Sequence, residues 1–330
     1  MRIGLAFDLK NDFQPDRETP DDAFEEYDSL DVVTAIAEGL RALGHRTILL
    51  GGGRKFISKI LKSKVDFVFN IAEGYGSLRS REAQVPAILE MLDIPYSGSD
   101  PQTLAITLDK PLAKQLVSTA GVKTPPWLLI GSLKSLAAVS AQDFPLPAFI
   151  KPAFEGSSKG IRLTSRADTA ARARAITRRL LAEYKQPVLI EKYIEGNEVT
   201  VGVVGNSPPA VVGIMRVLPR RKFKDFVYSL EVKRDWRNLV DYECPAKLPK
   251  PTIKRIIDAG LATYTTLACR DFSRVDFRVT PDGTPYFLEV NPLPGLNPES
   301  GDLPIMSYKM GWTYNGLIKA IFESALARYG

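Results

Sequence analysis

Histidine, cysteine and long apolar runs are all scarce in this sequence, and each scarcity excludes a class of protein. The 330 residues contain one histidine and two cysteines. Because histidine is the usual acid–base residue near neutral pH and a common metal ligand, catalytic triads and histidine-rich metal centres are nearly excluded. His45 follows the glycine of a predicted helix end, which favours a structural role. Cys244 and Cys269 lack CxxC spacing, so we expect reduced, structural thiols.

The distribution of apolar residues predicts a globular protein. No stretch approaches the roughly 20 apolar residues of a membrane span, and the N-terminal run Met1–Asp8 is too short for the core of a signal peptide. We therefore expect a cytoplasmic protein with no membrane partner. Apolar residues make up 45% of the chain, which is enough to fill the cores of two or three lobes.

The chain carries a modest excess of positive charge. Lysine and arginine number 44 against 38 acidic residues, for a net charge of +6, and they gather at Arg166–Lys185 and Arg216–Arg237. The first cluster is spaced along an alanine-rich stretch, as on the solvated face of a helix. Neither cluster has interleaved aromatic residues or a nucleic-acid-binding motif, so we predict no nucleic-acid partner. A basic loop also suits a nucleotide triphosphate.

The first hundred residues alternate between predicted strands and helices. Strands are predicted at Arg2–Phe7, Thr47–Leu50 and Val65–Asn70, and helices at Ser29–Leu43 and about 81–92. This alternation is typical of an open α/β domain with a mainly parallel sheet, which we assign to residues 1–100.

Two further lobes are predicted from the remaining chain. A helix from about Thr107 to before Gly121 lies near the start of a small central domain, assigned to residues 101–187. The third lobe, residues 188–330, contains strands, a basic stretch and a closing helix at about 312–328.

The segment from Ser273 to Asn291 reads as two alternating strands joined at Asp282-Gly283, a strong hairpin signal. A turn centred on that dipeptide places Asp276 opposite Glu289. The side-chain period of two then places four polar residues on one face: Arg274, Asp276, Glu289 and Asn291. The other face receives four apolar residues: Val275, Phe277, Leu288 and Val290.

This polar face predicts a metal site. Two carboxylates that face each other across a sheet repel one another unless a positive charge lies between them. A divalent cation with oxygen ligands satisfies Asp276 and Glu289, with Asn291 supplying a neutral oxygen and bound phosphates completing the shell of Mg²⁺. The alternative is a solvated hairpin face that is polar by chance.

Two other segments are compatible with nucleotide binding. Lys151 ends a predicted strand and is followed by the small, polar loop Glu155–Gly160, which lacks the Walker A spacing but could fold over phosphates as a lid. Residues 188–201 read as strand, connector and strand, and such a connector can present backbone groups to an adenine edge and a carboxylate to a ribose. Taken singly, each segment is equally compatible with an ordinary turn or hairpin.

Together these segments resemble the ATP-grasp superfamily, and specifically its D-alanine:D-alanine ligase-like family, from about Val65 to the C-terminus. Several motifs in the right order carry the resemblance: Pro95-Tyr-Ser-Gly98, Asp109-Lys110, Lys151-Pro-Ala-Phe-Glu-Gly-Ser-Ser158, Leu189-Ile-Glu-Lys192, Arg274-Val-Asp276, and Leu288-Glu-Val-Asn291 with Pro294-Gly295. The family implies a three-domain α/β fold with ATP between the central and C-terminal lobes.

The resemblance also implies roles for individual residues. Residues on the nucleotide and its phosphates would be Lys110, Lys151, Glu155, Ser157, Ser158, Glu191, Lys192, Tyr193, Ile194, Glu198 and Lys233. Two Mg²⁺ ions, with Mn²⁺ as an alternative, would be held by Asp276, Glu289 and Asn291. Catalytic candidates would be Arg274 and the Gly295 amide at the oxyanion, Ser157 in the loop, and Ser300 near the attacking amino acid.

The chain departs from the family where the acid substrate is held. The family carries a His-Gly and a Gly-Glu-Asp-Gly stretch in its first domain, and here the corresponding region, residues 69–84, has neither. A tyrosine expected after Lys233 is missing. The segment Lys10–Tyr27 replaces a short loop whose glutamate anchors the substrate amino group, a role that Glu25 or Glu26 could take. Arg79 or Arg81 could add positive charge to this pocket.

The sequence therefore predicts an ATP-dependent carboxylate–amine ligase that forms a peptide bond through an acyl phosphate. D-alanine with D-alanine is the default substrate pair, and another amino acid or carboxylate is the main alternative. A nucleotide-binding homologue without turnover is a further alternative. By family analogy we expect small-molecule substrates and a homodimer.

Overall fold

The computed structural model describes residues 1–221 and 226–330. Its N-terminal part is a parallel sheet of β1 (Arg2–Phe7), β2 (Arg46–Gly51) and β3 (Phe67–Ile71), in the order β2-β1-β3. Three helices accompany this sheet: α1 (Leu30–Ala42), α2 (Gly53–Ile60) and α3 (Gln84–Met91). Helix α1 forms because its apolar residues recur at helical spacing and are buried on one face. The predicted open α/β domain is confirmed, with strand ends within two residues of those expected.

The central part is an antiparallel sheet in the order β4-β7-β5-β6. Its elements are β4 (Trp127–Ile130), β5 (Ala148–Pro152), β6 (Arg166–Ala167) and β7 (Val188–Lys192), with helices α6 (Leu133–Ala138) and α7 (Ala170–Tyr184). Strand β7 pairs with both β4 and β5. The central sheet therefore extends beyond the boundary that the sequence analysis placed after residue 187.

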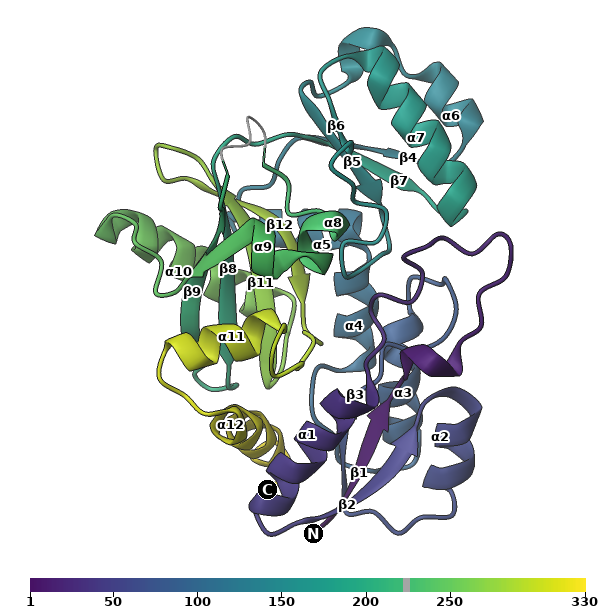
Figure 1. Ribbon diagram of the computed structural model, residues 1–330, viewed down its shortest axis with the longest axis vertical. Coiled ribbons are helices and arrows are strands. Elements are labelled where there is room, and N and C mark those ends of the chain that lie inside the picture. Colours follow the sequence, from purple (N-terminus) through teal and green to yellow (C-terminus); the bar gives the residue numbers. More distant parts are fainter. Residues whose placement is uncertain (222–225) are drawn as a thin grey trace.

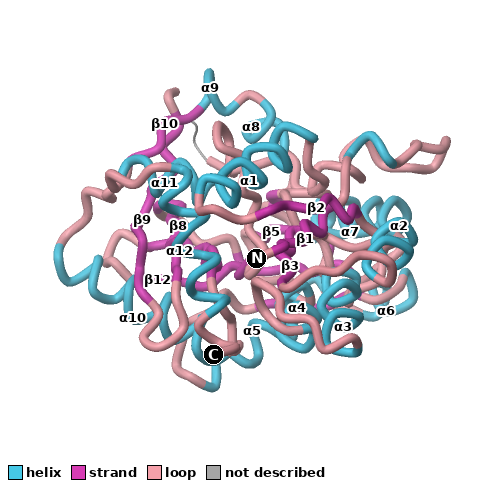
Figure 2. The backbone as a smooth tube through the Cα atoms, turned by 90° about the horizontal axis from the view of Figure 1, so that it is seen from below, coloured by secondary structure: helices cyan, strands magenta, loops and turns pink. Residues whose placement is uncertain are grey.

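The C-terminal part is a five-stranded antiparallel sheet in the order β10-β9-β8-β11-β12. Its strands are β8 (Asn197–Val204), β9 (Ala210–Pro219), β10 (Val240–Glu243), β11 (Phe272–Val279) and β12 (Pro285–Asn291). Its helices are α8 (Leu230–Arg234), α9 (Trp236–Leu239), α10 (Lys250–Thr266), α11 (Asp302–Lys309) and α12 (Tyr314–Leu326). Figure 2 shows most strands near the middle of the molecule, with β10 at its edge.

The helix predicted from about Thr107 is interrupted. Helix α4 (Pro101–Leu108) and helix α5 (Lys110–Thr119) are separated by the single residue Asp109. The Asp109 carboxylate accepts a hydrogen bond from the Leu112 amide at 3.1 Å and so caps α5. Pro111 cannot continue α4 because it has no amide hydrogen to donate, but it suits the first turn of a new helix.

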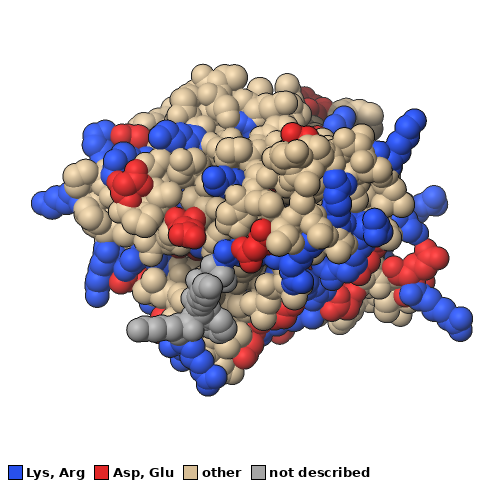
Figure 3. Space-filling model, turned by 90° about the horizontal axis from the view of Figure 1, so that it is seen from above, with Lys and Arg blue, Asp and Glu red and all other residues tan. Residues whose placement is uncertain are grey.

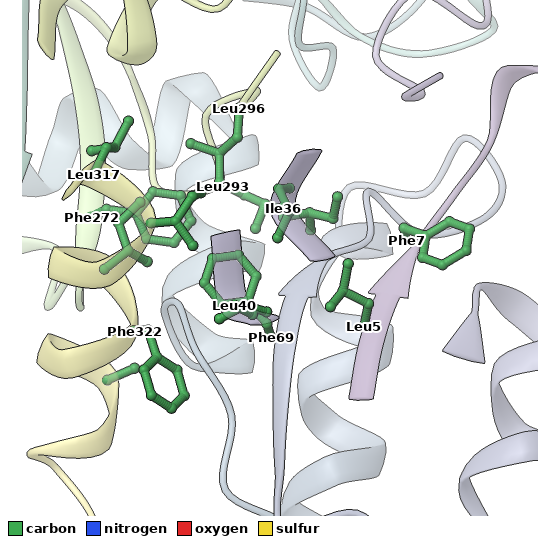
Figure 4. Packing of buried hydrophobic residues seen from close by; sticks show 14 of the residues in the cluster. Leu5, Phe7, Ile36, Leu40, Phe69, Phe272, Leu293, Leu296, Leu317 and Phe322 are labelled. Atoms are coloured by element: carbon green, nitrogen blue, oxygen red, sulfur yellow. The ribbon is translucent and has the colours of Figure 1, made fainter. Parts of the chain in front are cut away.

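The N-terminal and C-terminal parts share one hydrophobic core. Figure 4 shows side chains from β1, β3 and α1, such as Leu5 and Ile36, close to Phe272 and Phe322 from the other end of the chain. The central part has a separate core built on Ile150, Leu180 and their neighbours. The first and third parts are thus packed as a unit, while the central part depends on other contacts for its position.

One of those contacts is the segment Lys10–Tyr27, which rises from β1 beside the central part before α1 begins (Figure 1). The buried Asp22 accepts hydrogen bonds from the Tyr184 hydroxyl at 2.7 Å and from the Gly160 amide at 2.9 Å. Glu18 forms an ion pair with Lys185 at 2.7 Å. The segment therefore ties the N-terminal part to α7 and to the loop after β5.

Charged residues of both signs are intermixed on the face seen in Figure 3, without a broad patch of one sign. Lys222 and Lys224 of the second basic cluster lie outside the described residues. No helix in the described chain is long and apolar enough to span a bilayer. Both cysteines are free thiols, as expected, and Cys269 is buried.

Candidate active site

The β11–β12 hairpin brings the predicted polar residues together. Asp276 lies opposite Glu289 and Arg274 opposite Asn291, as the sequence predicted. The prediction for Leu288 was wrong. The register shifts after Asp276, so that Phe277 pairs with Phe287 and Leu288 forms a bulge that faces the nucleotide cavity described below.

Cations surround the facing carboxylates. Arg274 contacts Asp276 at 3.0 Å and Asp302 at 2.5 Å, and Lys110 lies 3.5 Å from Glu289. Burial, only partly offset by Arg274, raises the pKa of Asp276 to about 6. Burial also opposes ionisation of Glu289, but Lys110 and Lys151 outweigh it and lower its pKa to about 2. Asp276 is therefore harder to ionise than Glu289.

The hairpin face offers hard oxygen ligands to a divalent cation. Asp276 and Glu289 contribute carboxylates, and Asn291 has its side-chain oxygen fixed by the Leu293 amide at 2.8 Å. Among the residues that the structure describes, no group of three or more histidine, cysteine, aspartate or glutamate side chains could hold a metal. The donor set fits a cation that takes its remaining ligands from bound phosphates, as Mg²⁺ does.

A cavity opens between the central and C-terminal sheets above this face, and we call it the nucleotide cavity. Predicted nucleotide residues that line it are Lys151, Ser158, Glu191, Lys192, Tyr193, Ile194, Glu198 and Lys233. The other three, Lys110, Glu155 and Ser157, line a smaller adjoining cavity together with Glu289 and Asn291. Both cavities thus converge on the hairpin.

Glu191 holds lysines in place at the back of the nucleotide cavity. Its buried carboxylate pairs with Lys151 at 2.8 Å and with Lys114 at 2.9 Å. Burial lowers the pKa of Lys114 to about 8. The sequence analysis missed Lys114, although its position four residues after Lys110 on α5 places both lysines on one helix face.

Arg278 is a second residue that the sequence analysis missed. It lies two residues after Asp276 on the same strand face and lines the nucleotide cavity. Its guanidinium stands 5.1 Å from the Tyr193 ring centre and 3.4 Å from the Glu198 carboxylate. Arg278 therefore fixes two of the predicted nucleotide residues.

The loop Glu155–Gly160 is held in place by contacts with buried lysine and arginine side chains. Ser157 and Ser158 have positive φ angles, 48° and 60°, and Lys110 donates a hydrogen bond to the Glu155 carbonyl. The Glu155 side chain contacts Lys159 at 2.5 Å and Arg81 at 3.2 Å. Its carboxylate thus serves to anchor the loop, so any contact of the loop with phosphates falls to its other groups, such as the Ser157 hydroxyl.

Arg81 sits at the centre of this anchor. The side chain is fully buried and pairs with Glu26 at 2.8 Å as well as with Glu155. Lys159 contacts the same Glu26 carboxylate at 2.8 Å. We call Arg81, Glu26, Glu155 and Lys159 the anchor cluster, because it joins the segment before α1, the turn before α3 and the loop after β5.

A larger cavity of about 540 Å³ lies beside the nucleotide cavity, and we call it the substrate cavity. All four catalytic candidates line it: Arg274, Gly295, Ser157 and Ser300. Lys233, Arg274, Tyr228 and Asp302 line both large cavities. Lys233 stands 5.1 Å from the Tyr228 ring centre, so a tyrosine five residues before the lysine lies against it.

The two arginines expected to add positive charge to the substrate cavity do not line it. Arg81 is committed to the anchor cluster. The Arg79 side chain is 65% exposed and pairs with Asp109 at 2.9 Å. Glu25 and Glu26 do reach the cavity, but Glu25 pairs with Arg234 at 2.7 Å and Glu26 with the anchor cluster. Neither glutamate is free to hold a substrate amino group.

Comparison with known proteins agrees with this geometry. A family model described as "D-ala D-ala ligase C-terminus" matches residues 116–323. The D-alanine–D-alanine ligase of Aquifex aeolicus is 32% identical over 300 residues, covering 89% of this chain and 94% of the relative. Protein y4sG of Sinorhizobium fredii, named only as uncharacterized, is 30% identical and covers 90% of this chain and 88% of its own.

The fold has a counterpart among solved structures. The D-alanine–D-alanine ligase of Bacillus anthracis, crystallised with ATP, superposes with a TM-score of 0.77 over 99% of this chain and 98% of the other, at 24% identity. The two chains share their architecture from end to end.

Proposed function

Because the chain belongs to the D-alanine–D-alanine ligase family of the ATP-grasp superfamily, we propose that it uses ATP to activate a carboxylic acid and joins it to an amine. The observation that carries the proposal is the meeting of the nucleotide cavity and the substrate cavity. Arg274 and Lys233 line both, so a phosphoryl group at the end of the nucleotide cavity faces a carboxylate in the substrate cavity.

In the first step a carboxylate oxygen of the acid attacks the γ-phosphorus of ATP, and the bond to ADP breaks. The products are an acyl phosphate and ADP. Phosphoryl transfer needs positioning and dispersal of negative charge more than it needs an acid or base. Lys151 and Lys233 line the nucleotide cavity and Lys110 the adjoining one, so three cations are placed to share that charge.

In the second step the amine attacks the acyl carbon. The tetrahedral intermediate carries a negative oxygen, and its collapse releases phosphate and the amide while the nitrogen loses its proton. Arg274 and the Gly295 amide line the substrate cavity and serve as oxyanion donors. Arg274 is held in place by Asp276 and Asp302, so its orientation is set before the reaction. Ser300 is positioned beside the incoming amine.

We assign two Mg²⁺ ions, or Mn²⁺ in their place, to the oxygens of Asp276, Glu289 and Asn291. Held by these oxygens, such ions would neutralise phosphate charge. The pKa of Asp276, raised first by burial and further by the neighbouring Glu289 carboxylate, fits such a role. We also propose three domains, with the central one ending after Lys192, and a homodimer by analogy with the family.

The test is Mg²⁺-dependent release of phosphate and ADP from ATP, with product masses read in parallel, over a panel of D- and L-amino acids and other carboxylic acids. The relative from Aquifex aeolicus is named for joining D-alanine to D-alanine, so this pair belongs in the panel. Arg274→Ala should lower kcat by at least about a hundredfold. Arg41→Ala, an exposed change on α1, should leave kcat unchanged. Absence of turnover with every acid would refute the proposal.

A further inference from the structure

The substrate cavity has an acidic end formed by the N-terminal part. Asp28 lies just before α1, and Glu73 lies two residues after β3, at the carboxyl edge of the parallel sheet, where open α/β sheets bind their ligands. Both side chains line the cavity. Neither carboxylate has a hydrogen bond or an ion pair with any residue that the structure describes.

The other acids at this end are already neutralised. Glu25 pairs with Lys10 and Arg234, and Glu26 with Arg81 and Lys159. Asp28 and Glu73 are therefore the carboxylates available to a ligand. Burial and repulsion from Asp8 raise the pKa of Asp28 to about 7, and burial with repulsion from Glu82 raises that of Glu73 well above its usual range.

Further acids behind the cavity reinforce this charge. Glu82 is 7% exposed and has no hydrogen bond or ion pair within the described chain, and it lines the small cavity that shares Ser157 and Asn291 with the substrate cavity. Asp8 is 2% exposed, and its Oδ1 atom has no hydrogen-bond partner. Leaving so many carboxylates unpaired costs free energy in the unliganded protein.

The same cavity also carries positive charge. Lys233, which has no ion pair to any described residue, and Arg274 line it, and they suit the reacting carboxylate. A neutral amino acid brings one ammonium group, which would leave one of the two acidic side chains unpaired. Two unpaired carboxylates match a substrate with two positive charges.

We propose that Asp28 and Glu73 bind the α-ammonium and a cationic side chain of the acid substrate, so that the enzyme activates a basic amino acid, diamino or guanidino, in preference to a neutral one. This inference rests on the proposed ligase function and names the substrate class of the same site. Asp28 and Glu73 are its specificity-determining residues.

Hydroxylamine makes the test independent of the natural amine, because it attacks acyl phosphates and yields a hydroxamate. The full-length enzyme is given Mg²⁺, ATP, hydroxylamine and one acid at a time: lysine, ornithine and arginine against norleucine and alanine, each as D and L forms. Norleucine matches lysine in length but lacks the side-chain cation. We expect kcat/KM for the preferred basic acid to exceed that for norleucine by about 30-fold or more.

Variants assign that preference to the two carboxylates. Asp28→Asn and Glu73→Gln should each reduce the ratio of basic to neutral acid about tenfold or more, and the double variant should bring it close to one. Asp31→Asn removes an exposed carboxylate from the start of α1 and should leave the ratio unchanged. Thermal melting checks that each variant is folded, and if one is not, the wild-type ratio decides.

Each contrary result has a distinct meaning. Hydroxamate formed equally well from norleucine or alanine, or a preference for basic acids that survives in the folded double variant, would overturn this inference and leave the ligase function standing. Absence of hydroxamate with every acid would overturn the ligase function and this inference together.

Discussion

The hydroxyl of Tyr184, at the end of α7, donates to both carboxylate oxygens of Asp22, at 2.7 and 2.8 Å, across 162 residues of sequence. Asp22 is fully buried, so this contact is shielded from water. It joins the N-terminal segment Lys10–Tyr27 to the central sheet, whose hydrophobic core is otherwise separate. The position of the loop Glu155–Gly160 thus depends on a polar contact with the N-terminal part.

Asp22→Ala should loosen that loop. The change leaves the Gly160 amide and the Tyr184 hydroxyl without their acceptor, each at a cost of about 1–3 kcal/mol. We expect a lower free energy of unfolding in urea and a higher KM for ATP, because Gly160 ends the loop over the phosphates. Asp16→Ala, an exposed change in the same segment, is the control. Equal KM values for ATP in both variants would contradict the expectation.

Arg81 and Arg79 should differ sharply although they are two residues apart. Arg81→Ala removes a fully buried cation and leaves Lys159 as the cation that still pairs with Glu26 and Glu155. We expect it to destabilise the protein by about 3–5 kcal/mol. Arg79→Ala removes an exposed ion pair, which should cost at most about 1 kcal/mol and leave acid specificity unchanged. Chemical denaturation of both variants tests this. A loss of unfolding free energy no larger for Arg81→Ala than for Arg79→Ala would show that the anchor cluster contributes little to stability.

Lys114→Met should weaken ATP binding, although Lys114 does not line the nucleotide cavity. Lys114 is fully buried, pairs with Glu191 and donates to the Phe287 carbonyl at 3.1 Å. Without it, the whole charge of Glu191 acts on Lys151 and offsets the attraction of that lysine for phosphate. We expect KM for ATP to rise about tenfold, equivalent to about 1.4 kcal/mol. Lys134→Met, on the exposed side of α6, is the matched control and should leave KM unchanged.

Asp28 should make stability fall as pH rises. Its pKa is raised from 3.8 to about 7 in the folded protein, first by burial and then by Asp8. The folded state therefore binds this proton more tightly than the unfolded state does. The free energy of unfolding must decrease as pH rises from about 4 to about 7, by about 2–4 kcal/mol from this group.

Asp28→Asn removes that dependence. Compared with the wild type, the variant should gain stability steadily between pH 5 and pH 7 and then level off, as measured by urea denaturation at each pH without substrates. Asp31→Asn should run parallel to the wild type. A constant difference between Asp28→Asn and wild type over this range would contradict the raised pKa. A gain in stability combined with a loss of basic-acid turnover would mark Asp28 as a residue kept for binding.

The hairpin illustrates how far local sequence reasoning reaches. A turn centred on Asp282-Gly283 predicted that Asp276 faces Glu289, and the pairing is confirmed. The turn is in fact centred on Asp282, since Val279 pairs with Pro285, and the bulge at Leu288 restores the predicted pairing beyond it. The same bulge moved Leu288 off the core face, because an extra residue reverses the side-chain alternation. Sequence patterns give period and polarity but cannot locate a bulge that depends on neighbouring strands.

The sequence by itself determined the superfamily and the parallel N-terminal sheet, and it predicted most of the residues that line the nucleotide cavity, because those features depend on short motifs and on residues close in the chain. Only the tertiary structure decided the substrate half. It showed Arg81 buried in an ion cluster, β7 within the central sheet, and Asp28 and Glu73, which have no partner among the described residues, lining a cavity with Gly295 and Ser300. These residues come from distant parts of the chain, and their meeting depends on how the sheets pack.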